Sequence, residues 1–502
     1  MSLITDKHPD YDDNVYRWEF YLRSYMGGED YKNGQFLTKY VNEDKNEYLR
    51  RLELTPVDNH CGNVVHIYSS YLWRIPPTRN FNSLDGNPAL INFLKDADLD
   101  GRSFDSFMRE AQIWASVYGH CWMILDKPKS QAGTRAEELA QGIRPYINLF
   151  TPENVFDWKW ERTSSGRFQL QYLKVRESVV RDTDTKSTQM FRVWTNETIK
   201  LYEVSNDNER LVEEIDNPIG IIPAIFVPSR RSVVRGIGIS DLTDIATMQK
   251  AIYQENSEIE QLVRISNHPT LVKTFDTDAS AGAGSVVNMP DDLDPNMKPY
   301  IIQPSGGNLD AIRAAITDKV EAINRMAHLG ALRGTEAQTA SGIALQTEFQ
   351  LLNAKLSEKA DVLELAEEQM WRFFCIWQDV TPDVEVFYPD SFDIRDYPNE
   401  LTFLQSARAS GVRSITLMRE IDKRIADLIL DDEELKQSYA EIDESTTAIG
   451  DFSEKTQIYQ YHMNAGVVTP NEVRQKIGLD DLPNGDELLP PQTGQQRVNN
   501  GI

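Results

Sequence analysis

The chain has 502 residues, a formal net charge of −26 and only three cysteines. A surface that grips DNA needs lysine and arginine against the phosphates, so this charge argues against a general DNA-binding protein, although it suits a surface past which duplex slides without sticking. An odd, sparse set of cysteines excludes a disulfide framework. No apolar run reaches the roughly 18 residues of a membrane span and no signal-peptide pattern is present, so we expect a soluble protein made in a reducing cytoplasm.

Residues 1–237 are predicted to form helices and then an antiparallel β layer. Three stretches have the residue pattern of helices: 12–25, 48–73 and 104–118. The apolar run 121–126 is typical of a buried strand, and the charged stretch 130–142 is expected to be an exposed loop. Short alternating or apolar runs between polar turns then predict five further strands: 146–150, 168–173, 190–194, 199–202 and 224–227.

Two amphipathic helices follow, separated by a small insert. The first is predicted over 239–266, with Ser240 as its N-cap and with Pro269 ending it, because the residue before a proline avoids helical dihedral angles. The second is predicted over 309–329. The isoleucines of their apolar stripes are expected to pack the two helices together: Ile245, Ile252, Ile259, Ile312, Ile316 and Ile323. Between the helices, β-like runs at 270–272, 285–287 and 299–302 are punctuated by glycine and proline.

The glycine-flanked stretch 330–342 interrupts the helical pattern before a third, long helix that is predicted to reach about Trp377. A strand at 384–388 comes next, and from Tyr397 the chain is predicted to be helical. The polar residues 490–502 are typical of a frayed tail.

This order of elements resembles the portal proteins of tailed bacteriophages, in which a long helix, a small β insert, a second helix, a loop and a long helix follow one another. Two local motifs agree with the resemblance. Ser341-Gly342-Ile343-Ala344-Leu345 is similar to the step by which the portal tunnel loop enters the wing helix. Thr469-Pro470-Asn471-Glu472, followed by Gly478-Leu479 and Gly485-Asp486, is similar to a run common near portal C-termini. The resemblance covers roughly residues 8–490.

The resemblance implies an α+β subunit that assembles as a ring, with twelve copies by analogy. Its implied parts are an α/β wing at 1–237, a first stem helix at 238–266, a β-containing clip at 267–308, a second stem helix at 309–329, a tunnel loop at 330–342, a long wing helix with a returning strand at 343–396, a helical crown at 397–489 and a flexible tail at 490–502.

The implied function is a portal ring at one capsid vertex, through which double-stranded DNA is packaged and ejected. Its implied partners are further copies of the chain, the DNA, a terminase motor, adaptor and tail proteins, and the major capsid and scaffolding proteins, within a virion assembled in the host cytoplasm. No catalysis, cofactor, metal or membrane is implied. The resemblance assigns the channel-lining role to the tunnel loop, namely Gly330, Leu332, Arg333, Gly334, Thr335, Glu336, Gln338 and Thr339.

Other readings are weighed against this one. His60-Cys61 and His66 form the only local Cys/His cluster, but the two histidines do not share a helix face and no second half-site follows. No Gly-x-Ser-x-Gly elbow and no phosphate-binding loop is present. Without the resemblance, 330–342 reads more simply as a helix–helix connection. The alternatives are another structural phage protein, such as a scaffold or adaptor, and a cytosolic carboxylate-based hydrolase, which the abundance of carboxylates does not exclude.

Overall fold

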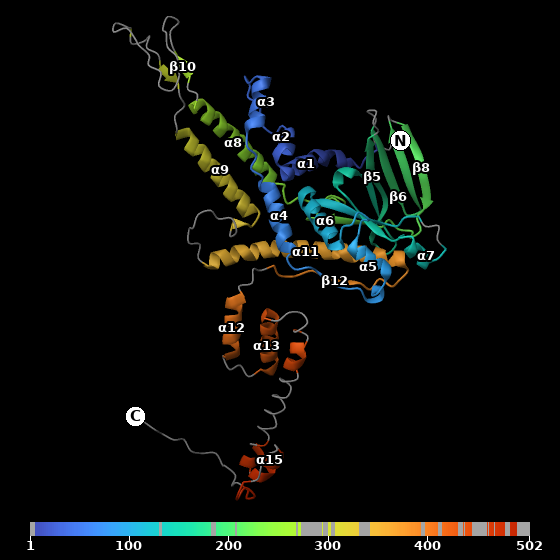
Figure 1. Cartoon of the computed structure of the whole chain (residues 1–502), viewed down its shortest axis with the longest axis vertical. Helices are drawn as coiled ribbons and strands as arrows, with labels where there is room; N and C mark the ends of the chain where they lie inside the picture. Colours follow the sequence, from blue (N-terminus) through green and yellow to red (C-terminus); the bar gives the residue numbers. More distant parts are fainter. Residues whose placement is uncertain are drawn as a thin grey trace. The chain divides into compact units, whose positions relative to one another are not determined.

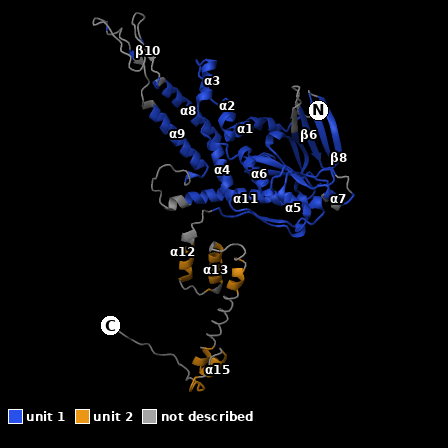
Figure 2. Ribbon diagram, in the orientation of Figure 1, with its two compact units in different colours: residues 1–393 blue, residues 394–502 orange. Residues whose placement is uncertain are grey.

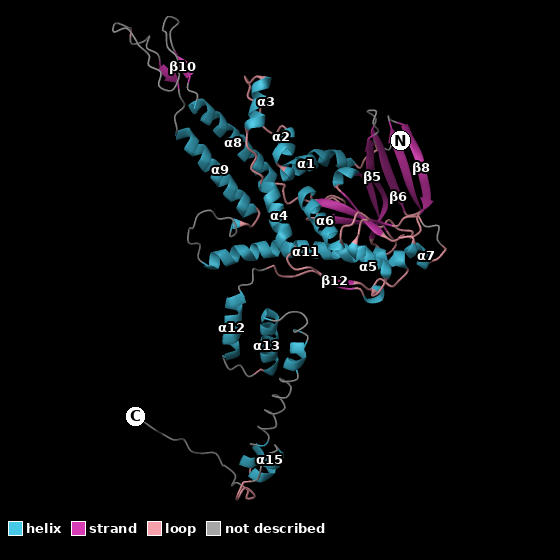
Figure 3. Ribbon diagram, in the orientation of Figure 1, coloured by secondary structure: helices cyan, strands magenta, loops and turns pink. Residues whose placement is uncertain are grey.

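The computed structural model divides the chain into two compact units, Met1–Asp393 and Ile394–Ile502 (Figure 2). The residues that it describes are 6–129, 133–181, 187–205, 208–267, 270–272, 294, 300–302, 307–330, 342–392, 397–409, 414–429, 435, 437–443, 459, 461–465, 467–476 and 482–488. The first unit combines helices with antiparallel sheets, which agrees with the α+β prediction (Figure 3). Among these residues, no helix combines the length and apolarity needed to cross a bilayer.

Helices open the first unit: α1 (Pro9–Met26), α2 (Gly28–Asn33), α3 (Lys45–Leu54), α4 (His60–Leu72), α5 (Pro88–Lys95) and α6 (Phe104–Tyr118). Asp44, Asn59 and Ser103 cap α3, α4 and α6, because each side chain accepts a backbone N–H of the first turn. The helical stretch predicted over 48–73 consists of two helices, α3 and α4. Thr55 is extended because Pro56 follows it, so the chain breaks into α3 and α4 there.

Two antiparallel sheets follow (Figure 1). In the smaller sheet, β2 (His120–Asp126) is wholly buried between β3 (Tyr146–Phe150) and β9 (Ala224–Pro228). The larger sheet runs in chain order: β4 (Val155–Arg162), β5 (Phe168–Arg181), β6 (Ser187–Thr195), β7 (Thr198–Ser205) and β8 (Asn208–Asp216). The sequence analysis missed β4 and β8. Strand β8 lies at the sheet edge and is exposed almost throughout, so it lacks apolar alternation. The stretch predicted as a loop, 130–142, contains the short helix α7 (Arg135–Ala140).

Helices α8 (Ile245–Asn267) and α9 (Gly307–Met326) lie side by side, and the strands β10 (Thr270–Val272) and β11 (Tyr300–Ile302) pair antiparallel beyond their ends (Figure 1). The predicted strand at 285–287 lies outside the described residues. The predicted helix start at 239 is wrong, since 241–244 form turns. Ser240 Oγ does accept the N–H of Leu242, but it also donates to the Val117 carbonyl at 2.6 Å, so tertiary contacts hold this segment out of the helix.

Close backbone packing fixes the same segment against the end of α6. A Cβ atom added at Gly238 would lie 2.0 Å from the carbonyl oxygen of Gly119, so only glycine fits there. The N–H of Asp241 donates to the Ser116 carbonyl at 3.1 Å. Residues 238–244 are therefore a packed joint between α6 and α8 and not the first turns of α8.

The long helix α11 (Gly342–Gln378) crosses the first unit, and β12 (Glu385–Phe387) pairs with β1 (Thr78–Asn80). The apolar stripe predicted for α11 is buried, as at Leu352, Leu363 and Phe374. Its one fully buried carboxylate, Glu367, accepts hydrogen bonds from Trp371 Nε1 at 2.9 Å and from the Tyr388 hydroxyl at 2.8 Å and pairs with Arg79. This network fastens β1 and the chain after β12 to α11.

A second buried network joins α11 to the joint before α8. Lys359 Nζ pairs with Asp241 and donates to Ser229 Oγ at 2.8 Å and to Ser116 Oγ at 3.0 Å. Lys355, one turn earlier, lies 3.1 Å from the other Asp241 oxygen. The side chains of Lys359 and Asp241 are each only 4 % exposed. Four segments far apart in the sequence therefore meet at one ion pair.

The second unit contains α12 (Tyr397–Ala409), α13 (Ile415–Ile429) and α15 (Pro470–Lys476). Helices α12 and α13 contact each other, and Arg408 Nε lies 3.0 Å from Asp422 Oδ1 across them. The C-terminal motif forms its own small fold: Glu472 and Thr469 cap each other at the start of α15. The buried Asn471 side chain accepts the Leu482 N–H at 2.7 Å and donates to Asp486 at 2.9 Å. These two bonds explain why the motif has asparagine at 471 and aspartate at 486.

The Asp241 pair sets a pH dependence. Burial alone raises the pKa of Asp241, but the charges of Lys359 and Lys355 and their hydrogen bonds outweigh it and lower the pKa from 3.8 to about 2. A carboxyl group with a lower pKa in the folded state stabilises the fold above its unfolded pKa. We therefore expect this contribution to stability to be complete above pH 3.8 and to be lost as the pH falls through about 2. The measurement is the free energy of unfolding of wild type and of the Asp241→Asn variant across this pH range.

Replacing Asp241 with asparagine should destabilise the first unit, because Lys359 would keep its charge in a buried site without a counter-charge. Breaking a buried ion pair costs about 3–5 kcal/mol, and we expect the free energy of unfolding in urea to fall by that order. The matched control is Asp244→Asn, an exposed acid on the same joint, which should change stability by less than about 0.5 kcal/mol. Equal effects of the two substitutions would contradict the role given to the ion pair.

Candidate functional site

The candidate site is the pair of helices α8 and α9 together with the loop that leads from α9 to α11. The loop's ends are placed: α9 ends near Ala327 and Leu329, both fully buried, and α11 begins at Gly342. The Tyr68 hydroxyl of α4 donates to the Ala327 carbonyl at 2.7 Å and fixes the start of the loop to the core. The predicted channel residues Leu332, Arg333, Gly334, Thr335, Glu336, Gln338 and Thr339 lie outside the described residues, whereas Gly330 is described.

The six isoleucines predicted to pack α8 and α9 differ in burial. Ile245, Ile252 and Ile323 are fully buried in the main core. Ile259, Ile312 and Ile316 are half-buried. Burial is therefore complete where the two helices join the body of the unit and partial further along them, so the outer half of the pair keeps apolar surface in the single chain.

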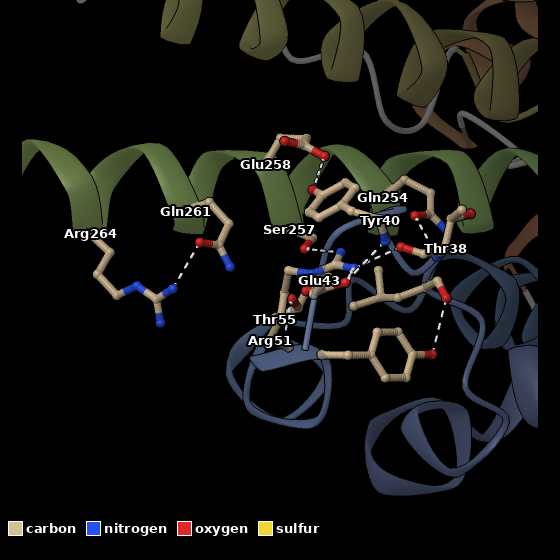
Figure 4. Close-up of polar contacts among 12 residues, drawn as sticks. Thr38, Tyr40, Glu43, Arg51, Thr55, Gln254, Ser257, Glu258, Gln261 and Arg264 are labelled. Carbon is tan, nitrogen blue, oxygen red and sulfur yellow. Dashed lines mark hydrogen bonds and ion pairs between the residues drawn. The ribbon is translucent and has the colours of Figure 1, made fainter. Parts of the chain in front are cut away.

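An N-terminal segment clamps α8 from the side (Figure 4). Arg51 of α3 forms a two-pronged ion pair with Glu43, at 2.7 and 2.8 Å, and donates to Ser257 Oγ of α8 at 3.0 Å and to the Thr38 carbonyl at 2.7 Å. The side chains of Arg51 and Glu43 are 2 % and 6 % exposed, so the pair is almost dry. Two parallel hydrogen bonds between guanidinium and carboxylate fix orientation as well as distance.

Three further contacts extend this clamp along one face of α8, and Figure 4 shows those of Thr38 with Gln254 and of Tyr40 with Glu258. The Thr38 N–H donates to Gln254 Oε1 at 3.0 Å, and Gln254 Nε2 donates to the Phe36 carbonyl at 2.6 Å. The Tyr40 hydroxyl donates to Glu258. The sequence analysis did not find this clamp, because its partners lie about 200 residues apart and no local pattern joins them.

The charges of the two helices nearly cancel. Helix α8 carries two cations and three carboxylates: Lys250, Arg264, Glu255, Glu258 and Glu260. Helix α9 carries three of each: Arg313, Lys319, Arg325, Asp310, Asp318 and Glu321. Lys319 Nζ lies 2.5 Å from Glu255 Oε1 and so links the helices. A surface of this composition has no excess positive charge with which to hold phosphates.

A metal site requires several His, Cys, Asp or Glu side chains arranged around one point. No group of three or more His, Cys, Asp or Glu side chains in the described part of the chain has the arrangement of a metal site. Within the cluster noted in the sequence, His60 lies 2.9 Å from Asp58 and His66 packs against the Tyr25 ring. Burial raises the pKa of the Cys61 and Cys121 thiols, which disfavours the reactive thiolate.

Comparison with protein families matches residues 16–447 to the family described as "Phage portal protein, SPP1 Gp6-like". The class that this match defines is that of the phage portal proteins, structural proteins of the virus particle. The chain belongs to this SPP1 Gp6-like portal family. The resemblance recognised from the motifs is therefore confirmed. A comparison with curated proteins gave no match.

Solved structures with a similar chain come from gene transfer agent particles. One, titled "Neck of empty GTA particle computed with C6 symmetry", is 10 % identical over 75 % of this chain and 92 % of that chain, with a TM-score of 0.42. A second, "Virion of native gene transfer agent (GTA) particle", is 11 % identical over 72 % and 89 %, with a TM-score of 0.40. A third, "Neck of native GTA particle computed with C12 symmetry", is 11 % identical over 74 % and 89 %, with a TM-score of 0.39.

Substituting methionine for Arg51 should loosen the clamp on α8, because Glu43 would stay buried without its partner. Loss of one member of a buried pair costs about 3–5 kcal/mol, so the urea midpoint should drop accordingly. Arg50→Met is the matched control, since Arg50 is the exposed neighbour, and it should leave the midpoint almost unchanged. Hydrogen exchange should also quicken in 36–43 and along α8. Unchanged exchange in α8 would show that the clamp does not hold this helix.

Proposed function

We propose that this portal protein forms a closed ring at one capsid vertex and that double-stranded DNA enters and leaves the capsid through the ring. In this proposal the ring, of twelve copies, sits in the virion among the major capsid and scaffolding proteins and assembles in the host cytoplasm. A terminase motor and later adaptor and tail proteins dock on it. Membership of the portal family over residues 16–447 is the observation that carries the proposal.

The α8–α9 pair fits the proposed role of a stem. Its outer half keeps half-buried isoleucines, Ile259, Ile312 and Ile316, that neighbouring copies would cover. A contact between two different surfaces of the same chain relates each copy to the next by a fixed rotation. The copies close into a ring when a whole number of these rotations makes one full turn. The balanced charges of α8 and α9 suit a passage, because affinity for DNA rises with the number of phosphates neutralised. Duplex would then slide past the stem without being held.

The loop Gly330–Gly342 is proposed to line the narrowest part of the passage, since it joins the second stem helix to the long helix α11. Its charged residues are Arg333 and Glu336, one of each sign, so each copy offers DNA no net charge there. The contact is therefore steric with weak electrostatic support. The small insert 267–308, with its β10–β11 pair, is proposed to be the clip on which the motor and adaptor dock. ATP hydrolysis would belong to the motor, and the ring itself would catalyse nothing.

Electron microscopy of the purified chain tests the ring. For wild type, we expect end-on images of a ring with a central hole. We expect Ile259→Asp to abolish rings. The unfolding midpoint of the single chain should stay nearly unchanged in this variant, because the side chain is only half-buried. Glu260→Gln, an exposed neighbour, is the control and should keep the rings. Monomers or dimers of wild type with no ring at any concentration would refute the proposal, and intact rings of Ile259→Asp would refute the packing role alone.

Removing the one positive charge of the loop tests the passage. Arg333→Ala should lower the yield of packaged DNA in particles while ring images of the same variant stay normal, because a side chain facing the passage holds no core together. The difference from wild type should shrink as ionic strength rises, since salt screens the contact between Arg333 and phosphate in the wild-type ring. Normal packaging would remove Arg333 from the passage, and broken rings would show that the loop is structural.

A further inference from the structure

An exposed loop between β9 and the joint before α8 combines arginine with valine. We call residues 230–235 the arginine–valine loop; three of its six residues are arginines. Val233 is 103 % exposed and Val234 is 37 % exposed. Arg230, Arg231 and Arg235 are also exposed. Such a concentration of cations and uncovered apolar side chains stands out in a chain with a net charge of −26.

The loop is held in one shape. The N–H of Ile239 donates to the Arg230 carbonyl at 2.9 Å, and Trp158 Nε1 donates to the Arg235 carbonyl at 3.2 Å. The Arg235 guanidinium lies 3.9 Å from the centre of the Phe168 ring. Gly236 has φ +87°, and a Cβ atom there would lie 2.3 Å from Trp158 Nε1, so the turn requires glycine. A fixed loop that leaves a valine fully in water has the features of a preformed binding element.

A groove between α1 and α6 has an apolar wall and an acidic rim, which complement the valines and arginines of the loop. Its apolar wall is formed by Val15, Leu22, Met26 and Trp114, and its volume is about 580 Å³. Met26 is 51 % exposed within it. We call this cavity the α1–α6 groove. It has room for both valine side chains of the arginine–valine loop.

The rim of the groove is acidic. Glu19, Asp30 and Glu153 line it against a single cation, Arg23. Arg23 is already engaged, because its guanidinium lies 2.9 Å from Glu19. Asp30 is exposed at this rim, whereas Glu153 is half-buried and its carboxylate accepts a hydrogen bond from the Thr151 hydroxyl at 3.4 Å.

We propose that the arginine–valine loop of one copy inserts into the α1–α6 groove of the next copy in the ring. This inference rests on the proposed ring. The valines would cover the apolar wall, and Arg230 and Arg231 would face Asp30 and Glu153. Loop and groove share no residue and no helix or strand, as a head-to-tail contact requires.

A second copy fits the loop better than DNA does. Binding to DNA phosphates is strengthened by cations and not by apolar side chains, whereas this loop presents two valines between its arginines. Arg235 is also occupied by its own aromatic partners, Phe168 and Trp160. A cationic loop meeting an acidic groove would offset part of the repulsion between copies that each carry a charge of −26.

The test compares variants at three exposed positions by mass photometry and ring images. Val233→Asp should reduce rings at least tenfold, because it places a charge against both the apolar wall and the acidic rim. Val41→Asp is the matched control: Val41 is 100 % exposed and lies outside loop and groove, so rings should persist. Met26→Arg should also abolish rings by filling the groove with a cation. All three substitutions lie on the surface, and the unfolding midpoint should stay within a degree or two of wild type.

Mixing the two ring-deficient variants gives the decisive result. Val233→Asp keeps a working groove and Met26→Arg keeps a working loop, so an equal mixture should restore association, at least as heterodimers, that neither variant shows alone. Absence of heterodimers, or normal rings from Val233→Asp, would overturn the loop-in-groove contact while the ring itself stands. Rings that form normally but retain less duplex on Arg231→Glu would assign the loop to DNA. Absence of rings in wild type would instead refute the proposed function.

Discussion

The buried ion pair between Asp241 and Lys359 is the contact on which the architecture of the first unit depends. It ties the long helix α11 to the joint from which α8 begins, and Ser116 and Ser229 complete its hydrogen bonds. The Ser240 hydrogen bond to Val117 and the Arg51 clamp also hold this region, but only the ion pair joins α11 to the joint by paired charges. A buried pair is weak evidence for net stability but strongly orients its elements, because either partner alone is costly in a dry site.

From this joint outward, the apolar residues of the α8–α9 pair change from fully buried to partly exposed. Ile245 and Ile252 belong to the main core, the clamp of Arg51 and Glu43 grips the middle of α8, and Ile259 is only half-buried. The chain thus buries the inner half of the α8–α9 pair by itself, and the proposed ring would cover the outer half. Nearly balanced charges along α8 and α9 suit the proposed passage of DNA, because DNA moves freely past a surface that touches it without binding its phosphates.

Local patterns predicted most helices, the buried strand β2 and several strands of the β layer, because periodic burial leaves a direct record in the sequence. They did not predict that β3 and β9 pair with β2 in a sheet of their own. Three features left no such record. Strand β8 is exposed at the sheet edge, the 238–244 joint is held by tertiary hydrogen bonds to α6, and the clamp joins Arg51 to residues about 200 positions away. For the site, the order of elements predicted two neighbouring helices followed by a loop, and their roles as stem and tunnel loop stay predictions. The loop residues from Leu332 to Thr339 lie outside the described residues.

The central claim is that duplex DNA passes beside the loop after α9. A photoreactive amino acid placed at position 333, in particles halted during DNA packaging, measures this contact directly. The account predicts covalent attachment of DNA at position 333 and none at position 212, an exposed residue of the edge strand β8. DNA attached at position 212 and not at position 333 would contradict the proposed path.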